Sequence, residues 1–234
     1  MPPPTPALCH GAQLVLQAAR ALFGEHGVDA VSIQDIAKRA GVSKANVFHH
    51  FASKEDLYVA VMRDALPDES DLFSRHAASP APFAERLTAL LEEHLAGMIR
   101  DPEGMQLVMR EMTGGNVERA RLLATQLFAD RVRQKIQFFE DARQRGELAP
   151  SVSSSEASML LGACASFYFN CRETSCHLQE VTGLPSLGTP ADFAQRMVPL
   201  LLNGLAAPAP VARPRAKSKT PTKAPSKIPR QVKP

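Results

Sequence analysis

Residues 32–57, SIQDIAKRAGVSKANVFHHFASKEDL, constrain the possible fold more tightly than any other stretch of this 234-residue chain. Ser32, Ser43 and Ser53 each precede a helical pattern, at the position where a serine side chain caps the first turn. Gly41 lies between the first two patterns, and two short helices joined by a glycine-bearing turn form a helix-turn-helix. We expect its small core to consist of Ile33, Ile36, Ala37, Val42, Val47 and Phe51.

The polar side chains of this unit suit the surface of DNA. The residues expected to face outward are Gln34, Ser43, Lys44, Ala45, Asn46, His49 and His50. In such a unit, the N-terminal end of the second helix reaches the base edges of the major groove. Asparagine pairs with adenine, lysine with guanine, and an alanine methyl touches the thymine methyl, while hydroxyls and histidines suit phosphates.

The rest of the chain is also helical in pattern, because apolar residues recur at helical spacing and no convincing strand alternation occurs. The sequence therefore predicts an all-α fold. The expected helices cover residues 12–26, 33–40, 44–51 and 54–66, an apolar stripe at 83–98, a shorter one at 105–112, and residues 117–145, 154–177 and 189–203. Residues 67–82 are expected to form a loop at a domain boundary.

Three of these helices carry specific expectations about burial. The inward face of the first is expected to contain Leu14, Ala18, Ala21, Leu22 and Phe23. The inward face of residues 117–145 is expected to contain Leu123, Leu127, Phe128, Val132, Ile136 and Phe139. The helix at 154–177 is nearly apolar all round, which is typical of a buried helix or an interface helix.

Charge is distributed unevenly along the chain. The net charge is +3, yet residues 208–234 hold eight Lys and Arg and no Asp or Glu. Subtracting these eight from +3 leaves a body with a net charge of −5. Residues 207–234 alternate Pro, Ala, Lys, Ser and Thr and cannot bury a core, so we expect a disordered basic tail.

The opening stretch, preceded by LQAARALFGEHGVDAVS, resembles the N-terminal domain of the tetracycline-repressor (TetR) family of bacterial transcription regulators. The resemblance spans Leu14 to Val61. The matching residues are Ala18, Ala19, Phe23, Gly27, Asp35 to Ala37, Ala40 to Ser43, His50, Phe51, Lys54 and Leu57. It implies a homodimeric repressor with a helix-turn-helix DNA-binding domain at residues 8–66. A larger helical domain at 67–206 would bind a ligand and dimerise, before the tail at 207–234.

Carried over by position, the resemblance implies a set of DNA contacts. The set is Ser32, Gln34, Ser43, Lys44, Ala45, Asn46, Phe48, His49, His50 and Lys54. Lys54 resembles the family's backbone-anchoring lysine. Two positions depart from the family: Phe48 replaces the usual tyrosine, and Cys9 to Gly11 replace a basic residue near the start of the first helix. Both departures remove phosphate contacts, and we hypothesise that the basic tail restores nonspecific DNA affinity through counterion release.

The resemblance also bears on the second domain. The helices at 154–177 and 189–203 correspond to the pair that dimerises in this family as a four-helix bundle. A ligand pocket is expected among the preceding helices, with Met109, Met112, Phe128, Met159, Phe167 and Phe169 as candidate lining residues. Methionines and aromatic rings suit an apolar or amphipathic ligand. We expect a double-stranded palindromic operator as the DNA partner, and a cytoplasmic protein on the nucleoid when bound.

The sequence also bears on several alternative functions. No nucleophile elbow, phosphate-binding glycine loop or metal motif supports an enzyme, so we expect neither catalysis nor a cofactor. Cys171, Cys176 and His177 invite a metal or redox sensor, but a spacing of five puts the two cysteines on different helix faces. An architectural DNA protein and a transcriptional activator remain alternatives. No apolar run long enough to span a membrane and no signal-peptide pattern is present.

Overall fold

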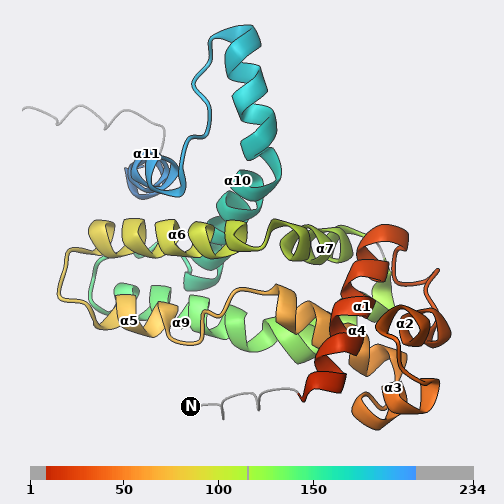
Figure 1. The fold of residues 1–234 in the computed structure, drawn as a ribbon. Helices are drawn as coiled ribbons and strands as arrows, with labels where there is room; N and C mark the ends of the chain where they lie inside the picture. The colour runs from red at the N-terminus through yellow and green to blue at the C-terminus, as the bar shows by residue number, and fades with distance from the viewer. Residues whose placement is uncertain (1–8, 115, 204–234) are drawn as a thin grey trace, which may run out of the picture. The chain divides into compact units, whose positions relative to one another are not determined.

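The structure, a computed structural model, describes residues 9–114 and 116–203 (Figure 1). Its elements are α1 (His10–His26), α2 (Ile33–Ala40), α3 (Lys44–His50), α4 (Lys54–Ala65), α5 (Leu72–Ala78), α6 (Phe83–Arg100), α7 (Pro102–Thr113), α8 (Val117–Leu123), the π-helical turn η1 (Ala124–Phe128), α9 (Ala129–Gln144), α10 (Ser154–Thr182) and α11 (Pro190–Asn203). No strand occurs in these two ranges, which confirms the predicted all-α class. The predicted tail at 207–234 and the domain limits at residues 8 and 206 lie outside the described residues.

The first four helices form a head around α1, which packs against α2, α3 and α4. Ser32 begins α2 with a capping box: its hydroxyl accepts from the Asp35 amide at 3.2 Å, and the Asp35 carboxylate accepts from the Ser32 amide at 3.0 Å. Gly41 ends α2 with a φ of 68°, a left-handed conformation that glycine adopts without strain. Ser43 then caps α3 by accepting from the Asn46 amide at 3.1 Å.

The buried face of α1 differs from the expected one. Val15, Ala19 and Phe23 are fully buried, one turn apart, and define the centre of the buried arc. Leu14 is 36% exposed and Ala21 is only half-buried, because both lie at the edge of that arc. The prediction of Leu14 as a core residue was therefore wrong: α1 packs against α2, α3 and α4 through the face centred on Val15, Ala19 and Phe23 instead.

The predicted loop at residues 67–82 was also wrong, since it contains α5 (Leu72–Ala78). Leu72 and Phe73 are buried, and α5 packs against α6 and α9. A seven-residue helix has too little periodic pattern to stand out in the sequence, and helices of this length depend on tertiary packing for stability.

Residues 117–145 do not form the single helix that was expected. The π-helical turn η1 interrupts them, and its wider turn rotates the face that α9 presents to the core. Leu123 and Leu127 are buried before or within the turn, but Val132 is 45% exposed after it. Phe138 and Phe139 are the buried residues of α9 along with Ala142, so the expectation for Val132 was wrong.

The last two helices complete the body. A capping box formed by Ser153 and Glu156 begins α10, which continues to Thr182 rather than ending near residue 177. α11 packs along α6, and Tyr168 of α10 contacts Phe193 of α11 with ring centroids 4.9 Å apart. Among the described residues, no helix is both long and apolar enough to cross a membrane.

Candidate nucleic-acid interface

The predicted DNA contacts cluster on α3 and the segments that flank it. The exposed members are Ser32, Gln34, Ser43, Lys44, Ala45, Phe48 and His49, and the half-buried ones are Asn46, His50 and Lys54. Phe48 is 44% exposed, and the Lys44 ammonium lies 5.9 Å from the centroid of its ring. An exposed phenylalanine beside a lysine offers an apolar edge and a positive charge to whatever α3 contacts.

Asn46 is placed less favourably for base reading than the sequence suggested. Its side-chain Oδ1 is buried and has no hydrogen-bond partner among the described residues. The atom faces the start of α1, where a Cβ on Gly11 would lie 3.8 Å away. Bidentate pairing with adenine needs both amide atoms free, so Asn46 would have to turn outward before reading a base.

The segment Cys9 to Gly11 has a structural role that sequence reasoning missed. A Cβ on Gly11 would lie 2.9 Å from Nε2 of His50, so a larger residue at this position would require the His50 side chain to shift. The Cys9 sulfur lies 3.8 Å from Nδ1 of His50, and the His49 and His50 rings stand 4.9 Å apart between centroids. The three-residue segment therefore positions the histidine end of α3.

The head is joined to the body through α7 and α8 by polar contacts that the sequence did not indicate. Arg110 of α7 donates to the carbonyl oxygens of Phe23 at 2.6 Å and Gly24 at 3.2 Å, at the C-terminal end of α1. A cation at a helix C-terminus meets the negative end of the helix dipole, and here it adds a second donor to the Phe23 oxygen, which also accepts from the Gly27 amide at 3.0 Å. The contacts are 86 and 87 residues apart in sequence, which explains why local patterns gave no signal for them.

A second link joins α4 to the same part of the body. The Tyr58 hydroxyl donates to the Glu111 carboxylate at 3.1 Å, and Arg119 donates to the same carboxylate at 2.8 Å. Burial, reinforced by Glu111, raises the pKa of Tyr58 well above its usual value. Arg119 also pairs with Asp29 in the α1–α2 connection, and this hydrogen bond lowers the pKa of Asp29. One arginine thus bridges the head and the body.

The six candidate pocket residues differ in their exposure. Met112, Met159 and Phe167 are exposed, Phe169 is buried, and Met109 and Phe128 are half-buried. A hollow of about 840 Å³ lies between α1, α4 and α7, and one of about 400 Å³ lies between α5 and α9. Neither is lined by any of the six, so their role as a pocket stays a prediction. Among the described residues, no cluster of His, Cys, Asp and Glu suits a metal ion.

The head has the architecture of a helix-turn-helix DNA-binding protein, with α3 in the position of the recognition helix. The sequence profile of "Bacterial regulatory proteins, tetR family" matches residues 15–61. Residues 15–61 thus match the N-terminal domain of the TetR family of helix-turn-helix transcriptional regulators, which confirms the resemblance found in the sequence.

Three known proteins illustrate this relationship. The transcriptional regulator UidR of Escherichia coli K12 is 26% identical over 161 residues, covering 63% of this chain and 74% of UidR. The structure of Salmonella enterica GusR is 25% identical with a TM-score of 0.60, covering 82% of this chain and 95% of GusR. FadR from Bacillus subtilis, solved in complex with stearoyl-CoA, shares the fold at 16% identity and a TM-score of 0.63, covering 83% of this chain and 99% of FadR.

Proposed function

We propose that this TetR-family regulator is a homodimeric repressor that leaves a palindromic operator when a small molecule binds its helical body. In this proposal residues 8–66 bind DNA, residues 67–206 dimerise and bind the effector, and the protein acts in the bacterial cytoplasm without catalysis. The main support is the exposed surface of α3, on which Lys44, Ala45 and Phe48 stand clear of the core beside the capping residue Ser43.

The proposed DNA contacts divide by chemistry. Lys44 and Ala45, in the first turn of α3, are assigned to base edges, with Asn46 joining them if its amide turns outward. The hydroxyls of Ser32 and Ser43, the imidazoles of His49 and His50, and the Lys54 ammonium are assigned to phosphates, with Gln34 at either. Phosphate contacts position the protein and base contacts specify the sequence, so the two groups predict different mutant behaviour.

Dimerisation is supported by apolar side chains left uncovered along α10. Met159 is 71% exposed, Phe167 55%, Leu178 52% and Val181 84%. Their spacings of eight, eleven and three residues keep them on one face of the helix. Exposed apolar residues aligned in this way mark an interaction surface, and a second copy of the chain would supply the second recognition helix that a palindrome requires.

A small-molecule effector is supported by the shared fold with FadR, which was solved with stearoyl-CoA. An apolar or amphipathic effector remains the proposal for this chain. Release from the operator, rather than activation, is the behaviour proposed because the family resemblance implies a repressor.

The deciding experiment is selection of bound sequences from random double-stranded DNA by the purified full chain at near-physiological salt. A recovered palindrome with half-sites about 34–36 Å apart, or a multiple of that spacing, is the expected result. Lys44→Ala should relax the preference at one position per half-site by about 1–3 kcal/mol, whereas Lys54→Ala should weaken all sequences alike. Arg133→Ala, which removes an exposed charge from α9, is the matched control and should change neither property.

The architectural alternative predicts a different outcome of the same selection. Such a protein would show steeply salt-dependent binding with little preference among sequences. Deleting residues 207–234 then tests the tail: if the tail contributes phosphate contacts, its loss should flatten the dependence of affinity on salt. An unchanged slope would rule out that contribution and leave the tail without a role in DNA affinity.

A further inference from the structure

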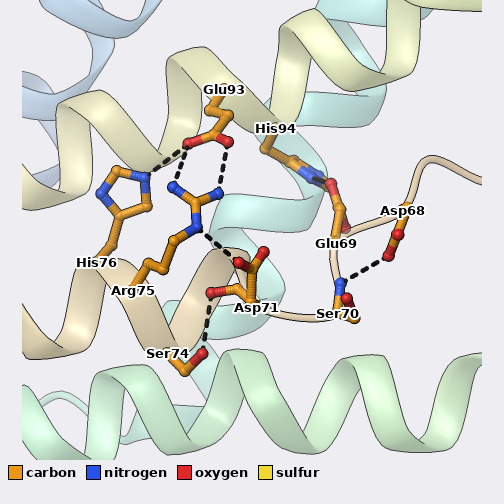
Figure 2. A network of polar contacts seen from close by, with 9 residues as sticks. All are labelled: Asp68, Glu69, Ser70, Asp71, Ser74, Arg75, His76, Glu93 and His94. Atoms are coloured by element: carbon orange, nitrogen blue, oxygen red, sulfur yellow. Dashed lines mark hydrogen bonds and ion pairs between the residues drawn. The ribbon is translucent and has the colours of Figure 1, made fainter. Parts of the chain in front are cut away.

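A buried carboxylate lies between the connection that follows α4 and the helices of the body. Glu69 is 7% exposed, and it pairs with Nδ1 of His94, from α6, and with Arg131, from α9, at 3.5 Å. Figure 2 shows Glu69 beside His94, with the exposed residues Asp68 and Ser70 on either side of it in the chain. Charges are buried at a large cost unless they are paired, so this arrangement calls for an explanation.

Two cationic side chains of α9, Arg131 and Lys135, lie near the single carboxylate Glu69. Lys135 lies one turn beyond Arg131 on α9, and among the described residues no carboxylate lies within 4.0 Å of its ammonium. Burial lowers the pKa of Lys135 and of Arg131, while Glu69 acts in the opposite direction on both. Asp68, a second acid that acts on Arg131, is exposed and accepts a hydrogen bond from the Ser70 amide. The site therefore carries more positive than negative charge, which favours the binding of another anion.

A hollow between α5 and α9 shares the residue Phe73 with this charged cluster. The Lys135 ammonium lies 5.9 Å from the ring centroid of Phe73, and Phe73 lines the hollow of about 400 Å³ between α5 and α9. Its other apolar lining residues are Ala77, Ala78 and Phe138, and its polar ones are Ser70, Ser74, Gln134, Gln137 and Asp141. Ser70 is the chain neighbour of Glu69. The volume falls within the usual range for small-molecule sites. The buried cations on one side and the apolar side chains of the neighbouring hollow on the other suit the two parts of an amphipathic anion.

We propose that the effector is an amphipathic carboxylate, and that Glu69 occupies the position of its carboxylate while the effector is absent. The incoming carboxylate pairs with Lys135, Arg131 and His94, and its apolar part fills the hollow beside Phe73. Glu69 then leaves for water, which its exposed neighbours Asp68 and Ser70 allow. The exchange replaces one carboxylate by another, so no cation is left unpaired in the interior.

The position of Glu69 connects this exchange to the DNA-binding head. Glu69 lies four residues beyond the end of α4, whose Leu57 and Val61 are fully buried. The neighbouring α5 is held to α6 separately, because Arg75 donates to Glu93 at 2.6 Å and His76 contacts the same carboxylate at 3.0 Å (Figure 2). Release of Glu69 thus frees the connection after α4 while α5 stays attached. This inference rests on the proposed ligand-responsive function.

The test uses octanoate as the probe and octanamide as its uncharged counterpart, with the full chain in thermal unfolding and titration calorimetry. A ligand that binds only the native state raises the unfolding temperature by mass action. Octanoate should raise it and octanamide should not. Lys135→Met should weaken octanoate binding by about tenfold or more, because the ion pair is lost while the volume of the side chain is kept.

Two further variants sharpen the result. Glu69→Gln should bind octanoate more tightly than the wild type, because the competing carboxylate is gone. Arg133→Met, on the same helix but exposed, should bind it as the wild type does. Equal binding of octanamide, unchanged binding by Lys135→Met, or unimproved binding by Glu69→Gln would each overturn the proposal.

A separate measurement, that of operator binding, tests the proposed function. Operator binding is measured without octanoate, on the sequence recovered by selection. Intact operator binding with no octanoate binding refutes this site and leaves the proposed function standing. Failure to recover an operator counts against the proposed function, whereas octanoate binding is still decided by calorimetry.

Discussion

Replacement of Gly104 by alanine tests how tightly the body is joined to the DNA-binding head. Gly104 is buried in the first turn of α7, and its amide donates to the Asp101 carboxylate at 3.1 Å. An added Cβ would meet the other oxygen of Asp101 far inside contact distance, the Arg20 guanidinium at 2.8 Å and Cβ of Ala65 at 3.0 Å. Asp101 also pairs with Arg20, so the methyl would press on the ion pair that joins α7 to α1.

The expected magnitude follows from two opposing effects. Overpacking of a filled site costs about 1–3 kcal/mol. Alanine in place of a helical glycine recovers up to about 1 kcal/mol, and less in the first turn. The Arg20–Asp101 pair is partly exposed, so its loss adds little. We expect a net loss of about 1–2 kcal/mol, which corresponds to a fall of roughly 2–8 °C in the unfolding temperature of a chain of this size.

Gly24→Ala is the matched control. Gly24 lies in the last turns of α1, and a Cβ there would meet nothing within 4 Å. This variant should be as stable as the wild type or more stable by up to about 1 kcal/mol, since alanine favours the helix. Urea and thermal unfolding of both variants give the comparison. If Gly104→Ala is no less stable than the wild type, the close packing of α7 against α1 and α4 is incorrect.

Three other variants test separate parts of the molecule. Phe48→Tyr should tighten binding to every DNA sequence alike by about 0.5–1.5 kcal/mol, because the added hydroxyl can donate to a phosphate. A gain in affinity that depends on the DNA sequence would contradict this prediction. Phe167→Glu should shift the sedimentation of the chain from dimer to monomer without loss of helicity, because the side chain is 55% exposed; a persistent dimer would place the interface elsewhere. Hydrogen bonds from Arg143, Ser154 and Gln144 lower the pKa of Glu140 to about 2. The stability that Glu140 contributes is thus present above its ordinary pKa of 4.5 and lost as the pH falls toward 2, so wild type and Glu140→Gln should differ in stability at pH 6 and converge near pH 2.

The helix α5 and the buried face of α9 show where sequence patterns fail to predict the structure. The buried face of α9 was misassigned because a π-helical turn shifts the helical phase, and no residue type in Ala124–Phe128 announces such a turn. The helix α5 was overlooked because seven residues between polar and proline-rich segments show too short a pattern. In both places, packing against distant helices decides a conformation that the local sequence leaves open.

The DNA-binding head was predictable because its signals are local. Ser32 accepts a hydrogen bond from an amide three residues away, and Gly41 takes its left-handed turn from its own backbone freedom, so short spacings carry the information. Other contacts join residues 25 to 87 positions apart in the sequence. They are the packing of Gly11 against His50, the hydrogen bond from Arg110 to the end of α1, and the pairing of Glu69 with His94. The sequence by itself thus determined the helix-turn-helix and its resemblance to the TetR-family domain, because hydrogen bonds within a few residues specify caps and turns. Only the tertiary structure decided how the head is held to the body and where a buried charge cluster lies, because those contacts exist only once distant helices have packed together.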